Sequence, residues 1–530
     1  MQSSDFLMDS PATVQALIDR RAEELAGREF LIDPDHGRSL SYRQLQQEVR
    51  AVADYLASQG LQPGSSVAYA MHNGRCCAVS ILGIMYGGYR AVAINLVAGR
   101  DVVAYVLLHS ETQLVLTQRA HLPLINAAVH SNTTASNLAE IPVHCVDDHV
   151  LDDWVSRFPA PGCRDMAAHS DALLMYTSGT TGKPKGVVLS HSNIIAGGHN
   201  VALGHLLSTV DRALCVLPLY HIHGLCVTLS GPLVSGGSVV LPGKFSTSAF
   251  WQLVDQNRCT WFSVVPTQIA YLLRDASSTT PGATAPDQSS AVAPPARPHL
   301  RFGRSASAPL SADVHAAFES QFSVPLIETM GLTETAAQIL TNPLPPGIRK
   351  LGSPGLPVGD EVIVVDSQLK PVDAGTEGEL LVRGPNVMSR YYRNEAATQE
   401  TLLDDGWLRT GDLGRKDENG YMFVTGRLKE LIIKGGENIA PREIDDALYQ
   451  HADVVEAAAF ACTCEDFGQR VEAAVALRQD SALGEADLLA LCVERVGKFK
   501  CPDRIHFLAE LPKGPSGKIQ RQKLASLLGG

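Results

Sequence analysis

A stretch rich in glycine, hydroxyl and lysine side chains at residues 176–186 is the strongest chemical signal in the sequence. It reads YTSGTTGKPKG and follows the apolar segment DALLM, which predicts a strand. Glycines let backbone amides approach an anion closely, and the hydroxyl and ammonium groups add donors and charge suited to a polyphosphate. The candidate phosphate-binding residues are Thr177, Ser178, Gly179, Thr180, Thr181, Gly182, Lys183 and Lys185. The spacing is not that of a Walker A loop, because only two residues separate the glycines and Pro184 follows the first lysine.

This string resembles the phosphate loop of the adenylate-forming superfamily, which includes acyl-CoA synthetases, aryl-CoA ligases, luciferases and peptide-synthetase adenylation domains. The resemblance spans roughly residues 10–528 and recurs at each downstream motif. It implies an AMP-forming acid–CoA ligase that uses ATP, Mg²⁺ and coenzyme A. The implied reaction forms an acyl-adenylate with release of pyrophosphate and then transfers the acyl group to the thiol.

The segment Gly331-Leu-Thr-Glu-Thr335 resembles the metal-binding motif of that superfamily. The resemblance implies that Glu334, together with Thr180, holds Mg²⁺ against the phosphates, and that Thr333 donates to the α-phosphate. Magnesium favours one carboxylate plus phosphate oxygens. The superfamily usually has an aromatic residue before the glycine, whereas this chain has Met330, whose thioether can still pack against an adenine ring.

Two further motifs resemble ribose contacts. Asp412, in GWLRTGD, corresponds to the aspartate that accepts hydrogen bonds from both ribose hydroxyls, which suits an acceptor-only carboxylate. Arg427, in GRLKE, resembles a second contact to ribose or phosphate.

The remaining motifs resemble parts of a moving lid. Lys429 occupies the hinge position of the superfamily, where a few residues absorb a large backbone change. Gly435 and Gly436 belong to a loop that lines the thiol tunnel in the second half-reaction. Lys518, in PKGPSGKI, resembles the lysine that neutralises carboxylate and α-phosphate during adenylation.

Three segments resemble the oxalate–CoA ligase branch: PLYHIHG, RSASAP and TNPLPPGIRK. Basic and hydroxyl side chains there suit a second anionic group on a short acid, of the oxalate or sulfoacetate type. The candidate acid-binding residues are His221, His223, Arg304, Ser305, Ser307 and Gly331, with His221 also the candidate gating histidine. The alternative is a structural role for His223 and Arg304, with a medium-chain fatty or aromatic acid as substrate.

These residues need a scaffold, and the hydrophobic pattern predicts an α/β fold. Alternating strands and helices to about residue 275 predict parallel sheets covered by helices, in two βαβ-type subdomains. Segments EVIVVD and GELLVR predict a small β-barrel-like subdomain. We expect an N-terminal adenylation domain at 1–427, with a mobile surface loop at 277–297, and a mobile α+β lid domain at 428–530.

The composition fits an enzyme acting on small molecules. The chain has 530 residues, 45% of them hydrophobic, and a net charge of −12, which argues against nucleic acid as a partner. Neither a signal peptide nor a membrane span is predicted, so we expect a cytoplasmic monomer or homodimer. An adenylation domain for a carrier protein, a luciferase-like oxygenase and a degenerate nucleotide-binding regulator are the other readings. The intact Lys518, Glu334 and phosphate loop argue against the regulator.

Overall fold

A computed structural model describes most of the chain. The described residues are 11–130, 141–158, 166–177, 184–278, 297–308, 310–451, 453–464, 466–479, 481–514 and 519–528. Most of the expected surface loop at 277–297 therefore lies outside them, as do residues 178–183 of the phosphate motif and Lys518.

The larger of two central sheets has nine strands within the described residues. In spatial order they are β15 (Leu356–Pro357), β14 (Ala337–Thr341), β13 (Leu326–Leu332), β12 (Phe302–Ser305), β11 (Trp261–Val264), β9 (Arg212–Cys215), β10 (Ser238–Val240), β1 (Glu29–Asp33) and β2 (Arg38–Ser41). The run from β13 to β1 is parallel, and the antiparallel strands lie at the two edges.

The second central sheet has seven strands in the described chain. Their order is β18 (Arg390–Tyr391), β8 (Lys185–Ser190), β7 (Asp171–Thr177), β4 (Arg90–Ala93), β3 (Ser66–Ala70), β5 (Thr112–Thr117) and β6 (Val143–Cys145). The run from β7 to β6 is parallel, as the sequence pattern predicts. Both parallel sheets are confirmed, and the antiparallel edges are additions that the alternating pattern does not reveal.

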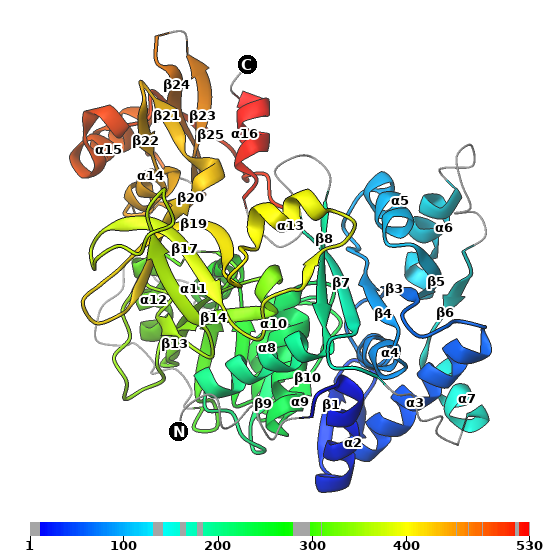
Figure 1. Ribbon diagram of the computed structural model, residues 1–530. Coiled ribbons are helices and arrows are strands. Elements are labelled where there is room, and N and C mark those ends of the chain that lie inside the picture. Colours follow the sequence, from blue (N-terminus) through cyan, green and yellow to red (C-terminus); the bar gives the residue numbers. More distant parts are fainter. Residues whose placement is uncertain are drawn as a thin grey trace.

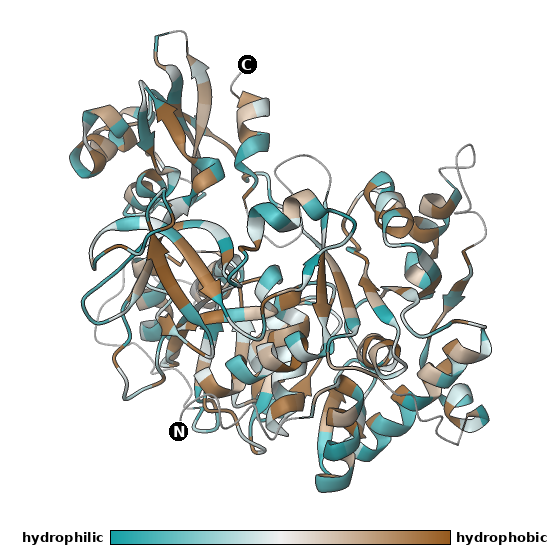
Figure 2. Cartoon of the chain, in the orientation of Figure 1, coloured by the Kyte–Doolittle hydropathy of each residue, from teal (hydrophilic) through white to brown (hydrophobic). Residues whose placement is uncertain are grey.

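Helices cover the two sheets (Figure 1). They are α2 (Val14–Glu24), α3 (Tyr42–Ser58), α4 (Arg75–Tyr86), α5 (Arg100–His109), η1 (Arg119–His121), α6 (Leu122–His130), α7 (Asp148–Arg157), α8 (His191–Gly204), the π-helix η3 (His223–Ser230), α9 (Gly231–Ser235), α10 (Thr247–Gln256), α11 (Pro266–Ser278), α12 (Ala312–Phe322), the 3-10 helix η4 (Thr333–Thr335) and α13 (Glu395–Thr401). Figure 2 shows apolar residues concentrated on the inner strands and polar residues on outer helix faces. This distribution is what burial of each sheet beneath amphipathic helices requires.

Two smaller sheets complete the described fold. The β-subdomain has strands β16 (Glu361–Val365), β17 (Glu377–Arg383), β19 (Leu408–Lys416) and β20 (Met422–Arg427). After η5 (Leu428–Glu430), the C-terminal unit has β21 (Ile432–Lys434), β22 (Glu437–Ile439), α14 (Pro441–Leu448), β23 (Val454–Cys464), β24 (Gly468–Leu477), α15 (Glu485–Lys500), β25 (Arg504–Phe507) and α16 (Arg521–Leu528). This unit projects from one end of the molecule (Figure 1). The predicted fold class is confirmed; that the C-terminal unit moves as a lid remains a prediction.

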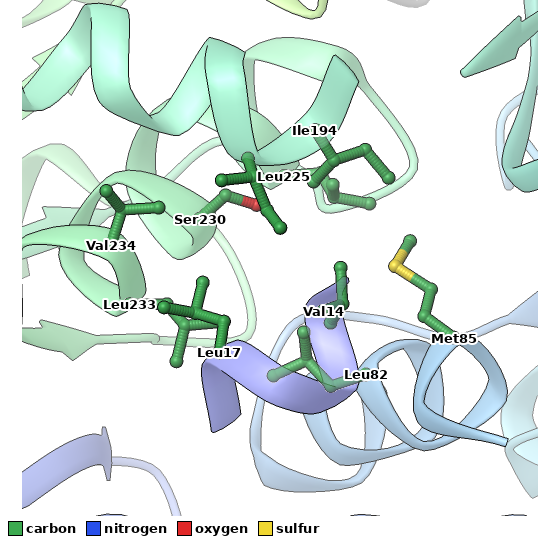
Figure 3. A pocket seen from close by; sticks show the side chains of 10 residues that line it. Val14, Leu17, Leu82, Met85, Ile194, Leu225, Ser230, Leu233 and Val234 are labelled. Carbon is green, nitrogen blue, oxygen red and sulfur yellow. The ribbon is translucent and has the colours of Figure 1, made fainter. Parts of the chain in front are cut away.

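The N-terminal helix α2 packs against both halves of the large domain. Val14 and Leu17 point toward Leu82 and Met85 of α4 on one side and Ile194 of α8 on the other (Figure 3). The gap left between them is only about 10 Å³, roughly the space of one water. This contact is therefore part of the core rather than a ligand pocket.

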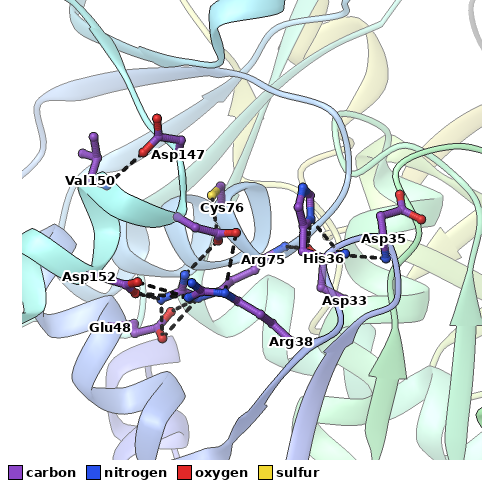
Figure 4. A network of polar contacts seen from close by, with 11 residues as sticks. Asp33, Asp35, His36, Arg38, Glu48, Arg75, Cys76, Asp147, Val150 and Asp152 are labelled. Atoms are coloured by element: carbon purple, nitrogen blue, oxygen red, sulfur yellow. Dashed lines mark hydrogen bonds and ion pairs between the residues drawn. The ribbon is translucent and has the colours of Figure 1, made fainter.

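A buried ion-pair cluster ties α3, α4 and α7 together. Arg75 is 3% exposed and donates to Glu48, Asp148 and Asp152, with Arg38 at the rim (Figure 4). Burial raises the pKa of the Glu48 carboxyl against the lowering effect of the Arg75 hydrogen bonds. A buried guanidinium is tolerated here because carboxylates satisfy it.

The described helices include none long and apolar enough to cross a membrane. The longest apolar stretch, residues 76–99, contains most of the buried helix α4 and the whole of the buried strand β4. The cysteines that the structure describes are free thiols, most of them buried.

Candidate active site

The candidate acid-binding residues lie where the central strands of the larger sheet end. Arg304 and Ser305 are the last residues of β12, and Met330 and Gly331 are near the end of the parallel neighbour β13. The carboxyl ends of parallel strands are where α/β proteins build ligand crevices. Strand order thus gathers segments that are distant in the chain.

Gly331 sits where no other residue fits. A Cβ built there would lie 1.5 Å from the backbone oxygen of Ala337 on β14. The close approach coincides with an irregular register between Met330 and Gly331. The chain then enters η4, in which Thr333 and Glu334 are half-buried. The nearby Met330 is also half-buried.

Glu334 is held by residues from a distant segment. The phenolic hydroxyl of Tyr391 on β18 donates to Glu334 Oε1 over 2.8 Å, and the Met388 amide donates to the Glu334 carbonyl over 2.7 Å. The Lys185 ammonium lies 4.8 Å from the centre of the Tyr391 ring. Burial and the Glu334 carboxylate both raise the pKa of Tyr391 well above its ordinary value. Tyr391 therefore joins the magnesium and phosphate motifs, and the sequence analysis missed it.

The phosphate motif is anchored by a hairpin. Strands β7 and β8 are antiparallel, with Tyr176 opposite Gly186 and Thr177 opposite Lys185. The intervening Ser178, Gly179, Thr180, Thr181, Gly182 and Lys183 lie outside the described residues. The hairpin opens beside η4, because Lys185 contacts the ring of Tyr391. The phosphate-binding roles of residues 178–183, and the metal-binding role of Thr180, remain predictions.

Asp412 and Arg427 form one unit on neighbouring strands. They face each other across β19 and β20, and Arg427 Nε donates to Asp412 Oδ1 over 2.7 Å. Asp412 is 4% exposed, and its carboxylate is the main cause that raises the pKa of Arg427. Arg427 thus orients the carboxylate that we expect to bind ribose.

The hinge and loop residues of the C-terminal unit are solvent-accessible. Lys429 lies in η5, and its Nζ is 3.9 Å from Glu400 Oε1 at the end of α13. Gly435 and Gly436 have φ values of +59° and +87° and form the turn between β21 and β22. Glycine adopts such left-handed conformations at no steric cost. The hinge and tunnel roles remain predictions.

Lys518 lies outside the described residues, but the base of its loop does not. Lys513 pairs with Ile519 in an isolated antiparallel bridge. The Lys513 ammonium contacts Glu456 at 2.5 Å and Glu510 at 2.8 Å, and these hydrogen bonds outweigh burial and raise its pKa.

Under the acid-site candidates lies a buried polar cluster. Arg304 is 2% exposed; its Nη1 is 2.7 Å from His223 Nε2 and 3.1 Å from Ser263 Oγ. Its Nε and Nη2 both donate to Gln338 Oε1, over 3.3 and 3.2 Å. On the other side of the imidazole, His223 Nδ1 is 2.9 Å from Ser307 Oγ. The structure therefore brings His223, Arg304 and Ser307 together, with Arg304 underneath.

That cluster contains an unusual charge. Burial lowers the pKa of Arg304 to about 9, so it stays a cation at neutral pH. Among the described residues, no carboxylate forms an ion pair with it; its partners are the neutral Gln338, His223 and Ser263. A buried cation without a counter-ion is costly, and an anionic ligand nearby offsets that cost.

The other two candidates lie at the margins of this cluster. His221 is half-buried, two residues before the π-helix begins at His223, with its ring 4.8 Å from that of Tyr220. The Ser305 hydroxyl is fully buried and has no hydrogen-bond partner in the described part of the chain. The acid-binding roles of His221 and Ser305 remain predictions.

Comparisons with known proteins identify the family. The model of the "AMP-binding enzyme" family matches residues 18–392, and that of the "AMP-binding enzyme C-terminal domain" matches residues 443–518. Sulfoacetate–CoA ligase of Cupriavidus necator is 44% identical over 520 residues, which cover 97% of each chain. Oxalate–CoA ligase of Arabidopsis thaliana is 32% identical and is matched over 96% of this chain and 95% of its own length.

Solved structures agree. The ATP-bound MatB of Rhodopseudomonas palustris matches with a TM-score of 0.86 at 28% identity, covering 97% of this chain and 99% of that one. An anthranilate CoA ligase in complex with anthranoyl-AMP matches with a TM-score of 0.85 at 27% identity, covering 99% of each. The chain therefore belongs to the AMP-binding enzyme family, in the adenylate-forming superfamily near its oxalate–CoA ligase branch. Within that family it is an AMP-forming acid–thiol ligase.

Proposed function

We propose that this enzyme joins coenzyme A to a short carboxylic acid that carries a second anionic group, of the sulfoacetate or oxalate type. The observation that carries the proposal is the buried Arg304 cation beside His223, with no carboxylate partner among the described residues. A hydrophobic acyl chain would leave that charge uncompensated, whereas an anion would not. The names of the two relatives, a sulfoacetate–CoA and an oxalate–CoA ligase, support the same substrate class.

In the first half-reaction, a carboxylate oxygen of the acid attacks the α-phosphorus of ATP, and pyrophosphate leaves. Lys518 neutralises the two approaching anions, and Thr333 donates to the α-phosphate. Backbone amides and hydroxyls of residues 177–183, with Lys183 and Lys185, hold the β- and γ-phosphates. Asp412, oriented by Arg427 over 2.7 Å, accepts from the ribose hydroxyls, and Met330 packs against the base.

Glu334 fits a magnesium site, with Thr180 as the second candidate. Glu334 is half-buried, and its one described side-chain hydrogen bond, from Tyr391, goes to Oε1; the Lys185 ammonium lies 4.8 Å from the centre of the same Tyr391 ring. Magnesium in nucleotide sites takes one or two carboxylates plus phosphate oxygens, so this single carboxylate is sufficient. When bound, Mg²⁺ supplies charge that offsets the polyphosphate during the displacement.

In the second half-reaction the lid turns about Lys429 and withdraws Lys518. The loop containing Gly435 and Gly436 then lines the path by which the coenzyme A thiolate reaches the acyl carbon. AMP leaves with its phosphate, and His221 gates access to the acyl group. Because ATP and coenzyme A are both metabolites of the cytoplasm, we expect the enzyme there.

Steady-state formation of AMP and acyl-CoA tests the proposal. Purified enzyme is given MgATP, coenzyme A and one acid from a panel: oxalate, malonate, sulfoacetate, acetate, octanoate or benzoate. We expect kcat/KM for sulfoacetate or oxalate to exceed that for acetate and octanoate by at least about a hundredfold, the selectivity typical of a site built for polar groups. Preference for octanoate or benzoate would instead support a medium-chain or aromatic acid ligase.

A further inference from the structure

We propose that Arg304 does not touch the substrate but, with Gln338 and Ser263, positions His223 as a neutral imidazole whose Nδ1–H orders the Ser307 hydroxyl toward the second anionic group of the acid. This inference rests on the proposed function and deepens it. It makes Ser307 the specificity-determining donor and Arg304, Gln338 and Ser263 positioning residues.

Hydrogen-bond inventory fixes the tautomer. A guanidinium has donors only, so His223 Nε2, 2.7 Å from Arg304 Nη1, must accept. A neutral imidazole that accepts at Nε2 carries its proton on Nδ1, which then donates to Ser307 Oγ over 2.9 Å. The Ser307 hydroxyl hydrogen is thereby directed away from His223.

Gln338 fixes Arg304 in turn. Its Nε2 donates to the Asn200 carbonyl over 3.1 Å, so its Oε1 must face the guanidinium, where it accepts from Nε and Nη2. Ser263 Oγ accepts from Arg304 Nη1 at 3.1 Å and lies 2.6 Å from His223 Nε2. The Nε–H, one Nη2–H and one Nη1–H of Arg304 are thus committed to protein partners. They are not presented to a ligand.

Ser307 is the least buried member of the cluster. It is half-buried, whereas Arg304 and His223 are only 2% and 7% exposed. Its backbone φ is +74°, a left-handed conformation that serine seldom adopts because it strains the backbone. Non-glycine residues keep such strain mainly at functional sites, where the surrounding structure holds them. The contact with His223 Nδ1 is one such restraint.

The charge then acts through the chain of hydrogen bonds. Arg304 polarises His223, whose Nδ1–H polarises the Ser307 hydroxyl, and an anion accepts from that hydroxyl. Protonating His223 would place an N–H against the guanidinium, so the imidazole stays neutral. Two other titratable groups lie in elements packed nearby. His205 is kept neutral, its pKa lowered by burial and by Arg304, and burial raises the pKa of Glu328 on β13 to about 7.

The first test is the variant Gln338→Glu, which places a carboxylate on Arg304 with almost no change in shape. The readout is the ratio of kcat/KM for sulfoacetate to that for propionate, an acid of similar size with one charge. We expect this ratio to fall about tenfold or more, because the buried charge is now compensated by the protein. A merely structural role would lower both values together, and an unchanged ratio overturns the inference.

The second test does not depend on a charged substitution. Ser307→Gly removes the hydroxyl while relieving the left-handed strain, so the fold should be retained or stabilised. We expect KM for sulfoacetate to rise about tenfold with a smaller change for propionate. Ser307→Asn, which tolerates the left-handed backbone and keeps a hydrogen-bond donor, should restore part of the selectivity. Equal KM increases for both acids in Ser307→Gly would contradict the assignment.

A pH profile separates a neutral from a charged His223. Both groups of sulfoacetate are ionised above about pH 5, so its KM should be flat from pH 6 to 8 when the imidazole is neutral throughout. A KM that rises steeply across pH 6–7 both in the wild type and in Glu328→Gln, which removes the neighbouring group with a pKa of about 7, would mean that His223 binds as a cation, which overturns the inference. If the wild type uses neither sulfoacetate nor oxalate, the proposed function and the inference both fail. If it uses them but Gln338→Glu keeps the selectivity, only the inference fails.

Discussion

Tyr391 donates its phenolic hydrogen to Glu334 over 2.8 Å, although 57 residues separate the two in the chain. The bond joins β18, at the edge of the smaller central sheet, to η4, which follows β13 of the larger sheet. The magnesium candidate is therefore held at the junction of the two subdomains. Its geometry depends on both sheets.

Tyr391→Phe should weaken magnesium use without unfolding the protein. A hydrogen bond to a charged group is worth about 1.5–3 kcal/mol, so we expect the Mg²⁺ concentration for half-maximal activity to rise about tenfold. Tyr392→Phe is the matched control, since the Tyr392 hydroxyl contacts Glu111 and Arg90 instead. Equal magnesium requirements in the two variants would remove Tyr391 from the site.

Arg427→Ala should damage nucleotide binding through Asp412. Removal of the guanidinium leaves the 4% exposed Asp412 carboxylate without this 2.7 Å partner, and we expect KM for ATP to rise about tenfold. Because Arg427 itself is 44% exposed, the loss in free energy of unfolding should stay below about 2 kcal/mol. Arg383→Ala, in an exposed pair with Glu361, should change neither value. An unchanged KM in Arg427→Ala contradicts the ribose assignment.

The buried carboxyl of Asp360 should make the free energy of unfolding depend on pH. It lies behind Gln338, and burial raises its pKa to about 7, against the lowering effect of hydrogen bonds from Asn386 and Asn200. The folded protein keeps this proton up to about pH 7, whereas the unfolded chain loses it near pH 4. The group therefore contributes stability that is fully present below pH 4 and is lost as pH rises to about 7.

Asp360→Asn removes this dependence. Relative to wild type, its free energy of unfolding should rise by about 3 kcal/mol between pH 4.5 and 7.5 in denaturant titrations. The exposed Asp404→Asn serves as control and should show no such trend. A constant difference between Asp360→Asn and wild type across this range would show that the carboxyl is ionised throughout.

Lys518→Ala should separate the two half-reactions. We expect the rate of adenylation, measured as pyrophosphate release, to fall about a hundredfold. This is the usual effect of losing one electrostatic contact to a transition state. Thioester formation from preformed acyl-AMP should fall by less than about threefold, because the lid has by then withdrawn the lysine. Lys523→Ala, an exposed lysine of α16, is the control. Equal loss in both steps would argue against a lid that exchanges poses.

The sequence predicts the chemistry better than the contacts that support it. Glu334, Asp412 and Arg427 are recognisable because motif spacing fixes them, and the parallel sheets follow from strand–helix alternation. The motifs do not reveal Tyr391, Ser263 and Gln338. Each of these residues acts through a hydrogen bond to a residue 34 to 57 positions away in the chain, which the sequence does not show. The alternation likewise gives no sign of antiparallel edges such as β8, whose pairing with β7 closes the phosphate hairpin.

Arg304 illustrates the same limit of prediction from sequence, because its burial and its hydrogen-bond partners are not visible there. Its residue type suggests an anion site, yet type alone cannot show that the guanidinium is 2% exposed and that Gln338, His223 and Ser263 take its donors. Only strand register reveals this, because Arg304 pairs with Ser263 across β11 and β12. In the proposed site, neutral donors face the acid and the charge lies behind them.

The most direct test of the account is ATP–pyrophosphate exchange in the absence of coenzyme A. Enzyme, MgATP and labelled pyrophosphate are incubated with sulfoacetate, oxalate, acetate or octanoate, and label entering ATP is counted. We predict exchange that depends on sulfoacetate or oxalate and exceeds that with acetate or octanoate at equal concentration. The absence of exchange with both sulfoacetate and oxalate, or exchange driven by octanoate alone, would contradict an acyl-adenylate route for a doubly anionic acid.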